Sequence, residues 1–109
     1  MAKLIIAVVS NDDSSKVIKA LVKDNFFVTK LATTGGFLMS GNTTIMVGVQ
    51  DFDKDRALKI IEVNSKKRTK LVPSSISTEF GFIQTTAPLE VTVGGATVFI
   101  LNAEELIKL

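Results

Sequence analysis

The chain has 109 residues, of which 46% are hydrophobic and 22% charged, and its 13 basic and 11 acidic side chains leave a net charge of +2. This composition predicts one folded, soluble domain over residues 1–109 and excludes a disordered chain or one that demands a nucleic-acid or membrane partner. Cysteine and histidine are both missing, which excludes disulfides, thiolate chemistry and the commonest general base and metal ligand. No apolar run reaches the length of a signal-peptide core or a membrane span, so we expect a cytoplasmic protein.

The first half of the chain predicts a strand, a helix and two further strands. The continuous apolar run at residues 4–9 is typical of a strand buried on both faces. A helix follows, with its apolar stripe formed by Val17, Ile18, Leu21 and Val22. Residues 26–32 and 43–49 are rich in β-branched and aromatic side chains, which favours a strand in each.

The second half predicts a helix, a long loop, two strands and a short closing helix. The helix begins at about Asp53, and a polar stretch with both prolines follows at residues 69–88. A loop of this length is uncommon in a small domain unless it is functional or mobile. Residues 89–93 and 96–101 read as two strands of a hairpin around Gly94-Gly95. A short helix capped by Asn102 is expected at the end.

This order of elements predicts an α+β fold of the ferredoxin-like βαββαβ type, with an extra C-terminal strand and a short helix. Such a fold is an antiparallel sheet with both helices on one face. The other face of the sheet needs a cover, and we expect oligomerisation through the sheet to provide it.

Several charged motifs are better explained by a role at a helix end than by metal binding, catalysis or phosphate binding. Asp51, Asp53 and Asp55 have the spacing of a calcium loop, but Arg56 stands where that loop requires glycine, so a helix start is favoured. Asp12-Asp13 is read as helix capping rather than a general acid–base pair. The basic residues 66–68 are read as a solvated helix end rather than a phosphate site. No base stands at a recognisable spacing from the hydroxyl-rich loops, so we expect no enzyme.

The glycine-rich run between the second and third strands is too long for a simple turn. It reads "KLATTGGFLMSGNTT" at residues 30–44. Glycines let backbone amides approach an anion, and hydroxyl groups add donors. Phe37-Leu38 could flank a purine, while Asn42 offers both a donor and an acceptor to a base edge. No Gly-Lys-Ser/Thr follows, so this is not a Walker loop, and on the residues alone a nucleotide site and a structural loop both stay open.

The same block, together with "LEVTVGGATVFIL" at residues 89–101 and "KLIIAVV…LVKDNF" near the start, resembles the cyclic-di-AMP receptor family (PstA/DarA) of PII-like signal transduction proteins. This family is known from Gram-positive bacteria and is part of the nitrogen regulatory protein PII superfamily. The resemblance implies a non-catalytic, cytoplasmic homotrimer that binds cyclic-di-AMP in clefts between subunits. It also implies signalling to a downstream protein through mobile loops at residues 35–41 and 69–87.

The resemblance also implies a set of ligand-binding residues, and it implies no cofactor and no metal. Base-edge hydrogen bonds are expected from Thr29 and Asn42, main-chain contacts from Gly36 and Gly48, and apolar packing from Phe37 and Leu38. The full expected set is Asn25, Phe27, Thr29, Gly35, Gly36, Phe37, Leu38, Asn42 and Gly48.

The chain departs from the family pattern at two positions where basic residues are expected. Phe27 replaces an arginine on the second strand, and Met39 replaces the basic residue that often follows "GGFL". Both changes remove positive charge from around a dianionic ligand, and a phenylalanine can only stack. The alternative is therefore a PII-like trimer that binds another adenine nucleotide, or one that acts purely through protein–protein contacts. The chain also has no tyrosine, so tyrosyl nucleotidylation is impossible.

Overall fold

The computed structural model describes residues 1–31, 41–72 and 89–109. Its elements follow the order β1 (Ala2–Ser10), α1 (Asn11–Lys23), β2 (Val28–Lys30), β3 (Asn42–Gln50), the 3-10 helix η1 (Asp51–Asp53), α2 (Lys54–Asn64), β4 (Arg68–Val72), β5 (Leu89–Val93) and β6 (Ala96–Ala103). The strands expected in the first half, and the helix expected from about Asp53, are confirmed.

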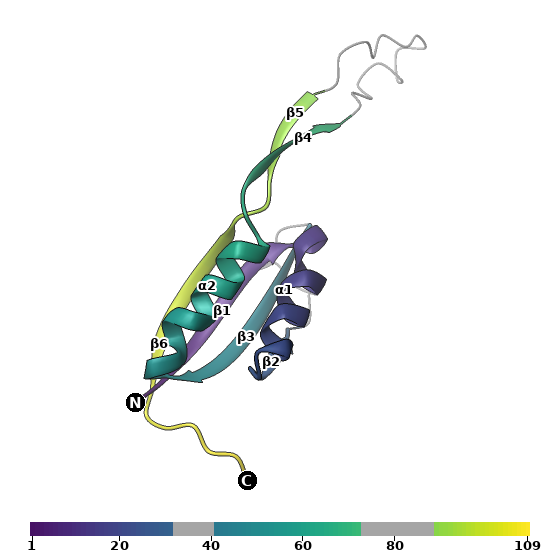
Figure 1. Ribbon diagram of the computed structural model, residues 1–109. Coiled ribbons are helices and arrows are strands. Elements are labelled where there is room, and N and C mark those ends of the chain that lie inside the picture. The colour runs from purple at the N-terminus through teal and green to yellow at the C-terminus, as the bar shows by residue number, and fades with distance from the viewer. Residues whose placement is uncertain (32–40, 73–88) are drawn as a thin grey trace, which may run out of the picture.

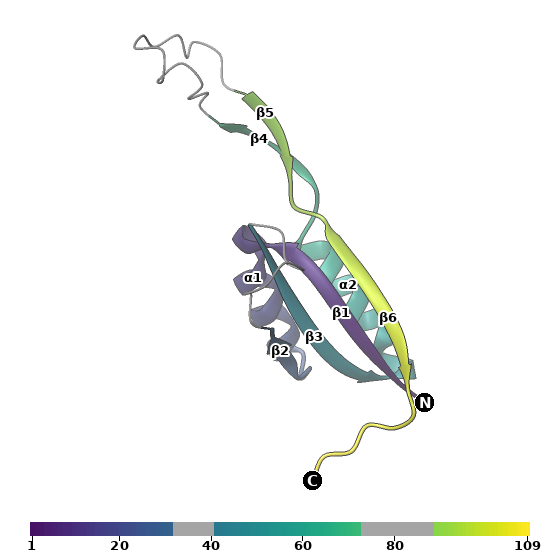
Figure 2. The ribbon, with the colours of Figure 1, turned by 180° about the vertical axis from the view of Figure 1, so that it is seen from behind.

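The main sheet has four strands in the order β2-β3-β1-β6, and each neighbouring pair is antiparallel. Helices α1 and α2 both lie on one face of this sheet, in front of it in Figure 1 and behind it in Figure 2. The predicted α+β fold, an antiparallel sheet with both helices on one face, is confirmed. The fourth strand of the ferredoxin-like sheet is β6.

The core lies between the sheet and the two helices. Side chains of a strand alternate between the two faces, and the odd-numbered residues of β1 and β3 point towards the helices. The largest fully buried aliphatic side chains of this layer are Ile5, Val9, Val17, Leu21, Ile45, Val47 and Ile61. Each such side chain stabilises the fold by about 1.5 to 3 kcal/mol relative to an exposed position.

Neither α1 nor α2, the two α-helices of the described residues, lies over the opposite face of the sheet. Register places Met46, Ile6 and Phe99 side by side across β3, β1 and β6, and the next row along joins Gly48, Leu4 and Leu101. Phe99 is 51% exposed, although it is a large aromatic side chain at the centre of its strand. This surface, called the open face below, is therefore apolar, and among the described residues it is half-buried at β1 and β3 and exposed at Phe99 and Leu101 of β6.

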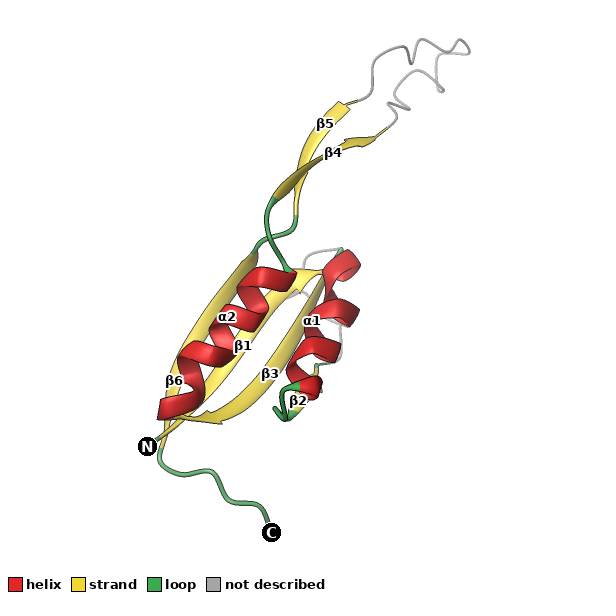
Figure 3. Cartoon of the chain, in the orientation of Figure 1, coloured by secondary structure: helices red, strands yellow, loops and turns green. Residues whose placement is uncertain are grey.

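Strands β4 and β5 form a separate two-stranded sheet that projects beyond the end of the main sheet (Figure 3). This β4–β5 arm corrects two sequence predictions. Residues 69–72 belong to β4 and not to a loop, and residues 73–88 lie outside the described part of the chain. The two strands on either side of Gly94-Gly95 are not a hairpin either, since β5 pairs with β4 while β6 pairs with β1.

Gly94 and Gly95 connect the arm to the main sheet with positive φ angles of 86° and 82°. A Cβ atom on Gly94 would collide with the carbonyl oxygen of Lys66 and lie 2.8 Å from Nη1 of Arg68. The glycine pair is therefore needed for close approach of the two chain segments at the base of the arm, and not for a two-residue turn.

The helix expected over residues 102–109 is wrong. Strand β6 continues to Ala103, and residues 104–109 form neither helix nor strand. Asn102 pairs with Lys3 in the ladder and accepts a hydrogen bond from its ammonium group instead of capping a helix. A six-residue helix gains too few hydrogen bonds to offset its costly nucleation, and pairing with β1 extends the strand instead.

Among the helices in the described part of the chain, none has the length and apolar character needed to cross a bilayer.

Candidate functional site

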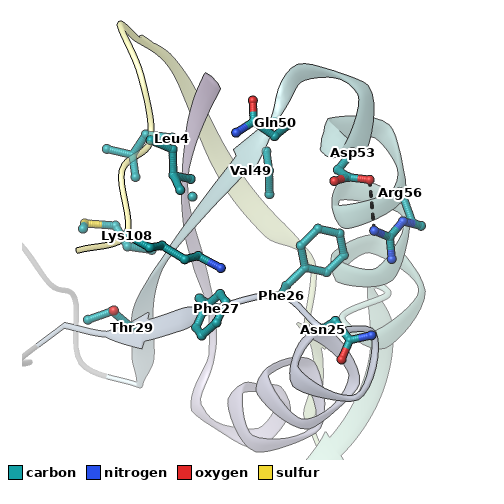
Figure 4. Close-up of a pocket in the computed structure, with 13 residues that line it drawn as sticks. Leu4, Asn25, Phe26, Phe27, Thr29, Val49, Gln50, Asp53, Arg56 and Lys108 are labelled. Atoms are coloured by element: carbon teal, nitrogen blue, oxygen red, sulfur yellow. Dashed lines mark hydrogen bonds and ion pairs between the residues drawn. The ribbon is translucent and has the colours of Figure 1, made fainter. Parts of the chain in front are cut away.

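A cleft of about 500 Å³ opens at the end of the main sheet where α1 leads into β2 (Figure 4). This volume lies in the range of small-molecule sites in proteins. The cleft is lined by Leu4, Asn25, Phe26, Phe27, Thr29, Met46, Gly48, Val49, Gln50, Asp53, Arg56, Leu106 and Lys108. Four chain segments that are distant in sequence therefore meet there: β1, the α1–β2 link, the β3–α2 region and the segment after β6.

Asn25 determines how the chain leaves α1 and enters the cleft. Its φ of 67° is in the left-handed region, which asparagine tolerates better than most residues. The amide of Asn25 donates to the carbonyl of Val22 at 3.0 Å, and the amide of Phe26 donates to that of Leu21 at 3.0 Å. This pair of hydrogen bonds is a Schellman motif, which ends the helix and reverses the chain. Asn25 thus has a structural role besides lining the cleft.

The reversal at Asn25 sends two neighbouring phenylalanines in opposite directions. Phe26 is 7% exposed and packs in the core, with the guanidinium carbon of Arg56 at 4.4 Å from its ring centroid. Phe27 is 68% exposed and lines the cleft. An exposed ring at the edge of a cleft is available for stacking with a planar group.

The floor of the cleft belongs to the open face. Thr29 pairs with Met46, and Gly48 pairs with Leu4, so all four residues lie on the side of the sheet away from the helices. At Gly48 the missing side chain leaves room for a neighbour, because a Cβ atom there would lie 3.1 Å from Cδ1 of Leu106. A larger residue at position 48 would push Leu106 away from the sheet.

Arg56 and Asp53 form one end of the cleft, and Arg56 is also bonded to Asp24 outside it. Its guanidinium donates to Oδ1 of Asp53 at 3.0 Å, to the backbone carbonyl of Asp24 at 3.2 Å and to the side chain of Asp24. The hydrogen bonds that Arg56 donates to Asp53, and secondly to Asp24, raise the pKa of Arg56 above its ordinary value. Arg56 therefore stays charged, and its charge is shared between two acids of its own chain.

The segment after β6 forms the remaining side of the cleft, and reasoning from sequence missed it. Leu106 packs at Gly48, and the ammonium nitrogen of Lys108 lies 3.7 Å from the ring centroid of Phe27. In Figure 4 the Lys108 side chain extends towards Phe27. The expectation of a helix here concealed that Leu106 and Lys108, two positions apart, face the same cleft.

The structure brings together four of the residues expected at the site, namely Asn25, Phe27, Thr29 and Gly48. Asn42 does not line this cleft. It begins β3 and lies six residues from Gly48, which is about 20 Å along a strand. Gly35, Gly36, Phe37 and Leu38, together with Met39, lie outside the described residues.

The end of the glycine-rich segment is attached to the start of α1. The amide of Asn11 donates to the carbonyl of Gly41 at 2.8 Å, and the hydroxyl of Thr43 donates to the side chain of Asn11. Ser10, rather than Asp12 or Asp13, is the helix N-cap, since its side chain accepts from the amide of Asp12 at 3.3 Å. Asn42 stands between these two anchoring contacts.

The other motifs singled out from the sequence have structural partners. Asp51 lies 3.8 Å from Nζ of Lys3, and Asp53 is bonded to Arg56. Within residues 1–31, 41–72 and 89–109, no group of three or more acidic side chains gathers as a metal site. Arg68, from the basic run 66–68, belongs to β4 and pairs with Asp13 rather than ending a helix.

Two comparisons with known proteins each match nearly the whole chain. A family model described as "Cyclic-di-AMP receptor" matches residues 2–109. The chain is also similar to a functionally unknown protein from Pediococcus pentosaceus ATCC 25745 whose crystal structure is known. The two share 34% sequence identity with a TM-score of 0.75, and the match covers 99% of this chain and 97% of the other.

Proposed function

The chain belongs to the cyclic-di-AMP receptor family, and we propose that it binds cyclic-di-AMP in the cleft described above. The observation that carries this proposal is that Asn25, Phe27, Thr29 and Gly48 line one cleft of about 500 Å³. These residues come from the α1–β2 link and from the neighbouring strands β2 and β3. A common ligand site explains why residues from three segments meet in one cleft, whereas the local conformation of each segment does not.

The chemistry of the cleft suits an adenine nucleotide. The exposed ring of Phe27 stacks on a base, and Asn25 and Thr29 offer hydrogen-bond donors and acceptors to its edge. Gly48 leaves room at the β3 backbone for Leu106, so that the Leu106 side chain lies close to the sheet beside the proposed ligand. In this proposal Gly35, Gly36, Phe37, Leu38 and Asn42 form the second part of the site.

We place the complete site between subunits of a homotrimer of PII-like domains. The distance of about 20 Å between Gly48 and Asn42 along β3 supports this arrangement, because a neighbouring subunit would bring the Asn42 end of one chain to the Gly48 end of another. The apolar open face, with Phe99 and Leu101 exposed, offers a surface for such an assembly.

The proposed receptor works in the cytoplasm without turning over its ligand. Binding changes the arrangement of residues 35–41 and 69–87, and a downstream protein reads that change. The attachment of Gly41 to Asn11 supports a connection between the glycine-rich segment and the folded body.

A second candidate is a PII-like trimer that binds a different adenine nucleotide. It is favoured by Phe27, which places a neutral ring where the family pattern has an arginine. Such a site prefers a nucleotide whose phosphates do not lie against position 27 over cyclic-di-AMP.

Isothermal titration calorimetry with cyclic-di-AMP, cyclic-di-GMP and ATP distinguishes the candidates. Saturable heat with cyclic-di-AMP alone, at one ligand per chain, supports the receptor. Saturation with ATP, together with no binding of cyclic-di-AMP at a ligand concentration on the order of 10⁻⁴ M, supports the second candidate instead. A dissociation constant of that size corresponds to a binding free energy of about 5 kcal/mol.

A further inference from the structure

Among the described residues, the charges that line the cleft leave one cation, Lys108, without a carboxylate partner. Among the lining residues of the described chain the charged side chains are Asp53, Arg56 and Lys108. Arg56 is bonded to Asp53 and Asp24, so this group brings no net positive charge to a ligand. Lys108 takes part in none of the ion pairs formed by the described residues.

Lys108 is held at the cleft by the packing of its neighbour Leu106 and by the contact of its own ammonium group with Phe27. Leu106, two positions earlier, packs at Gly48, while the intervening Ile107 is exposed. The ammonium itself lies over the exposed ring of Phe27, at 3.7 Å from the centroid. A cation–π contact at an exposed site is weak, so the ammonium can bind an anion without losing a strong partner.

We infer that Lys108 is the phosphate-binding residue of this cleft, acting together with Phe27 as a stacking platform; this rests on the proposed function. An arginine combines a flat stacking surface and a positive charge in one side chain. Here the two properties are divided between Phe27 in the α1–β2 link and Lys108 in the segment after β6. A dianionic cyclic dinucleotide needs such a charge because burial of an unpaired phosphate is costly.

The alternative role for Lys108, steric obstruction of the cleft, predicts the opposite effect on ligand affinity. If residues 104–109 only obstruct the cleft, loss of the Lys108 side chain frees space and tightens ligand binding. If Lys108 pairs with phosphate, its loss weakens binding and reduces the dependence of affinity on salt, since one charge contact disappears.

The test is calorimetric titration of the full chain with cyclic-di-AMP at low and high salt. Lys108→Met keeps the length and apolar stem of the side chain, Lys108→Arg keeps its charge, and Lys19→Met removes the same charge from the exposed side of α1. We expect about ten- to hundredfold weaker binding in Lys108→Met, near-normal binding in Lys108→Arg and no change in Lys19→Met. Adding Phe27→Arg to Lys108→Met should restore most of the affinity, because one arginine then supplies both properties.

The inference is overturned if Lys108→Met binds as tightly as the wild type, or more tightly, while the wild type binds normally. In that case the proposed function survives. If the wild type gives no heat with cyclic-di-AMP, the proposed function fails and the assignment of Lys108 fails with it. Circular dichroism of each variant shows whether the fold is retained.

Discussion

The guanidinium of Arg68 donates two hydrogen bonds to the carboxylate of Asp13, at 2.9 and 3.2 Å, across 55 positions of sequence. The Asp13 side chain is only 6% exposed and lies in the first turn of α1, whereas Arg68 begins β4. Arg68 also donates to the carbonyl of Lys66 at 3.1 Å. This pair therefore fixes the base of the β4–β5 arm to the folded body.

Arg68→Met should lower the thermal stability, because it leaves a buried carboxylate without its partner. Arg68→Lys should have a smaller effect, since it keeps the charge but loses the two-pronged geometry. The hydrogen bonds that Arg68 donates to Asp13 raise the pKa of Arg68, so the stabilisation is present below the ordinary arginine pKa and is lost only as the pH rises through the folded-state value. The difference from wild type should stay constant from about pH 6 to about pH 10. Equal midpoints of thermal unfolding for the wild type and Arg68→Met would refute this role.

Gly94→Ala should destabilise the protein by at least about 2 kcal/mol, because it combines a positive φ with a collision against the Lys66 carbonyl. Gly41→Ala is the matched control. Its φ is 92°, but no atom of the described residues lies within 4 Å of the added Cβ, so we expect only the backbone strain of about 1 kcal/mol. Urea unfolding measures both variants. A larger loss in Gly41→Ala than in Gly94→Ala would contradict the proposed close approach.

Phe26→Ala and Phe27→Ala should separate stability from binding at adjacent positions. Phe26 is part of the core, so its truncation should cost about 3 to 5 kcal/mol of unfolding free energy. Phe27 is exposed, so its truncation should change stability by no more than about 0.5 kcal/mol. Phe27→Ala should nevertheless weaken cyclic-di-AMP binding in calorimetry. Unchanged affinity in a folded Phe27→Ala variant would remove Phe27 from the site.

Phe99→Lys should prevent assembly without unfolding the subunit, because Phe99 is exposed at the centre of the open face. Val22→Lys is the control, since it introduces the same charge at an exposed apolar position on α1. Sedimentation equilibrium should give a trimer for the wild type and for Val22→Lys, and a monomer for Phe99→Lys. A Phe99→Lys trimer would exclude the open face as the assembly surface.

The sequence predicted the main sheet and its helices because their patterns are local. The apolar run of β1 and the stripe of α1 each identify an element from a few neighbouring residues. Strand β4 was missed because its pairing with β5 is long-range and its sequence "RTKLV" joins directly to a polar stretch. The Gly94-Gly95 pair carries the usual hairpin signal, but the close contact with Lys66 that requires it cannot be seen in the sequence.

The same distinction applies to the candidate site. Asn25, Phe27, Thr29 and Gly48 were expected from a resemblance that follows the chain residue by residue, and the fold brings them to one cleft. Arg56 and Lys108 were not expected there. Their positions depend on how α2 and residues 104–109 pack against the α1–β2 link, and no short motif records such packing.

The most direct test of this account is a crystal structure of the protein grown with cyclic-di-AMP. We expect ligand density in the cleft lined by Phe27, Thr29 and Gly48, completed by the Asn42 end of a neighbouring subunit, with the Lys108 ammonium about 2.8 Å from a phosphate oxygen. Density in another place, such as the surface between α2 and β6 at Ser65 and Val98, would contradict the account. An empty cleft at saturating ligand would contradict it as well.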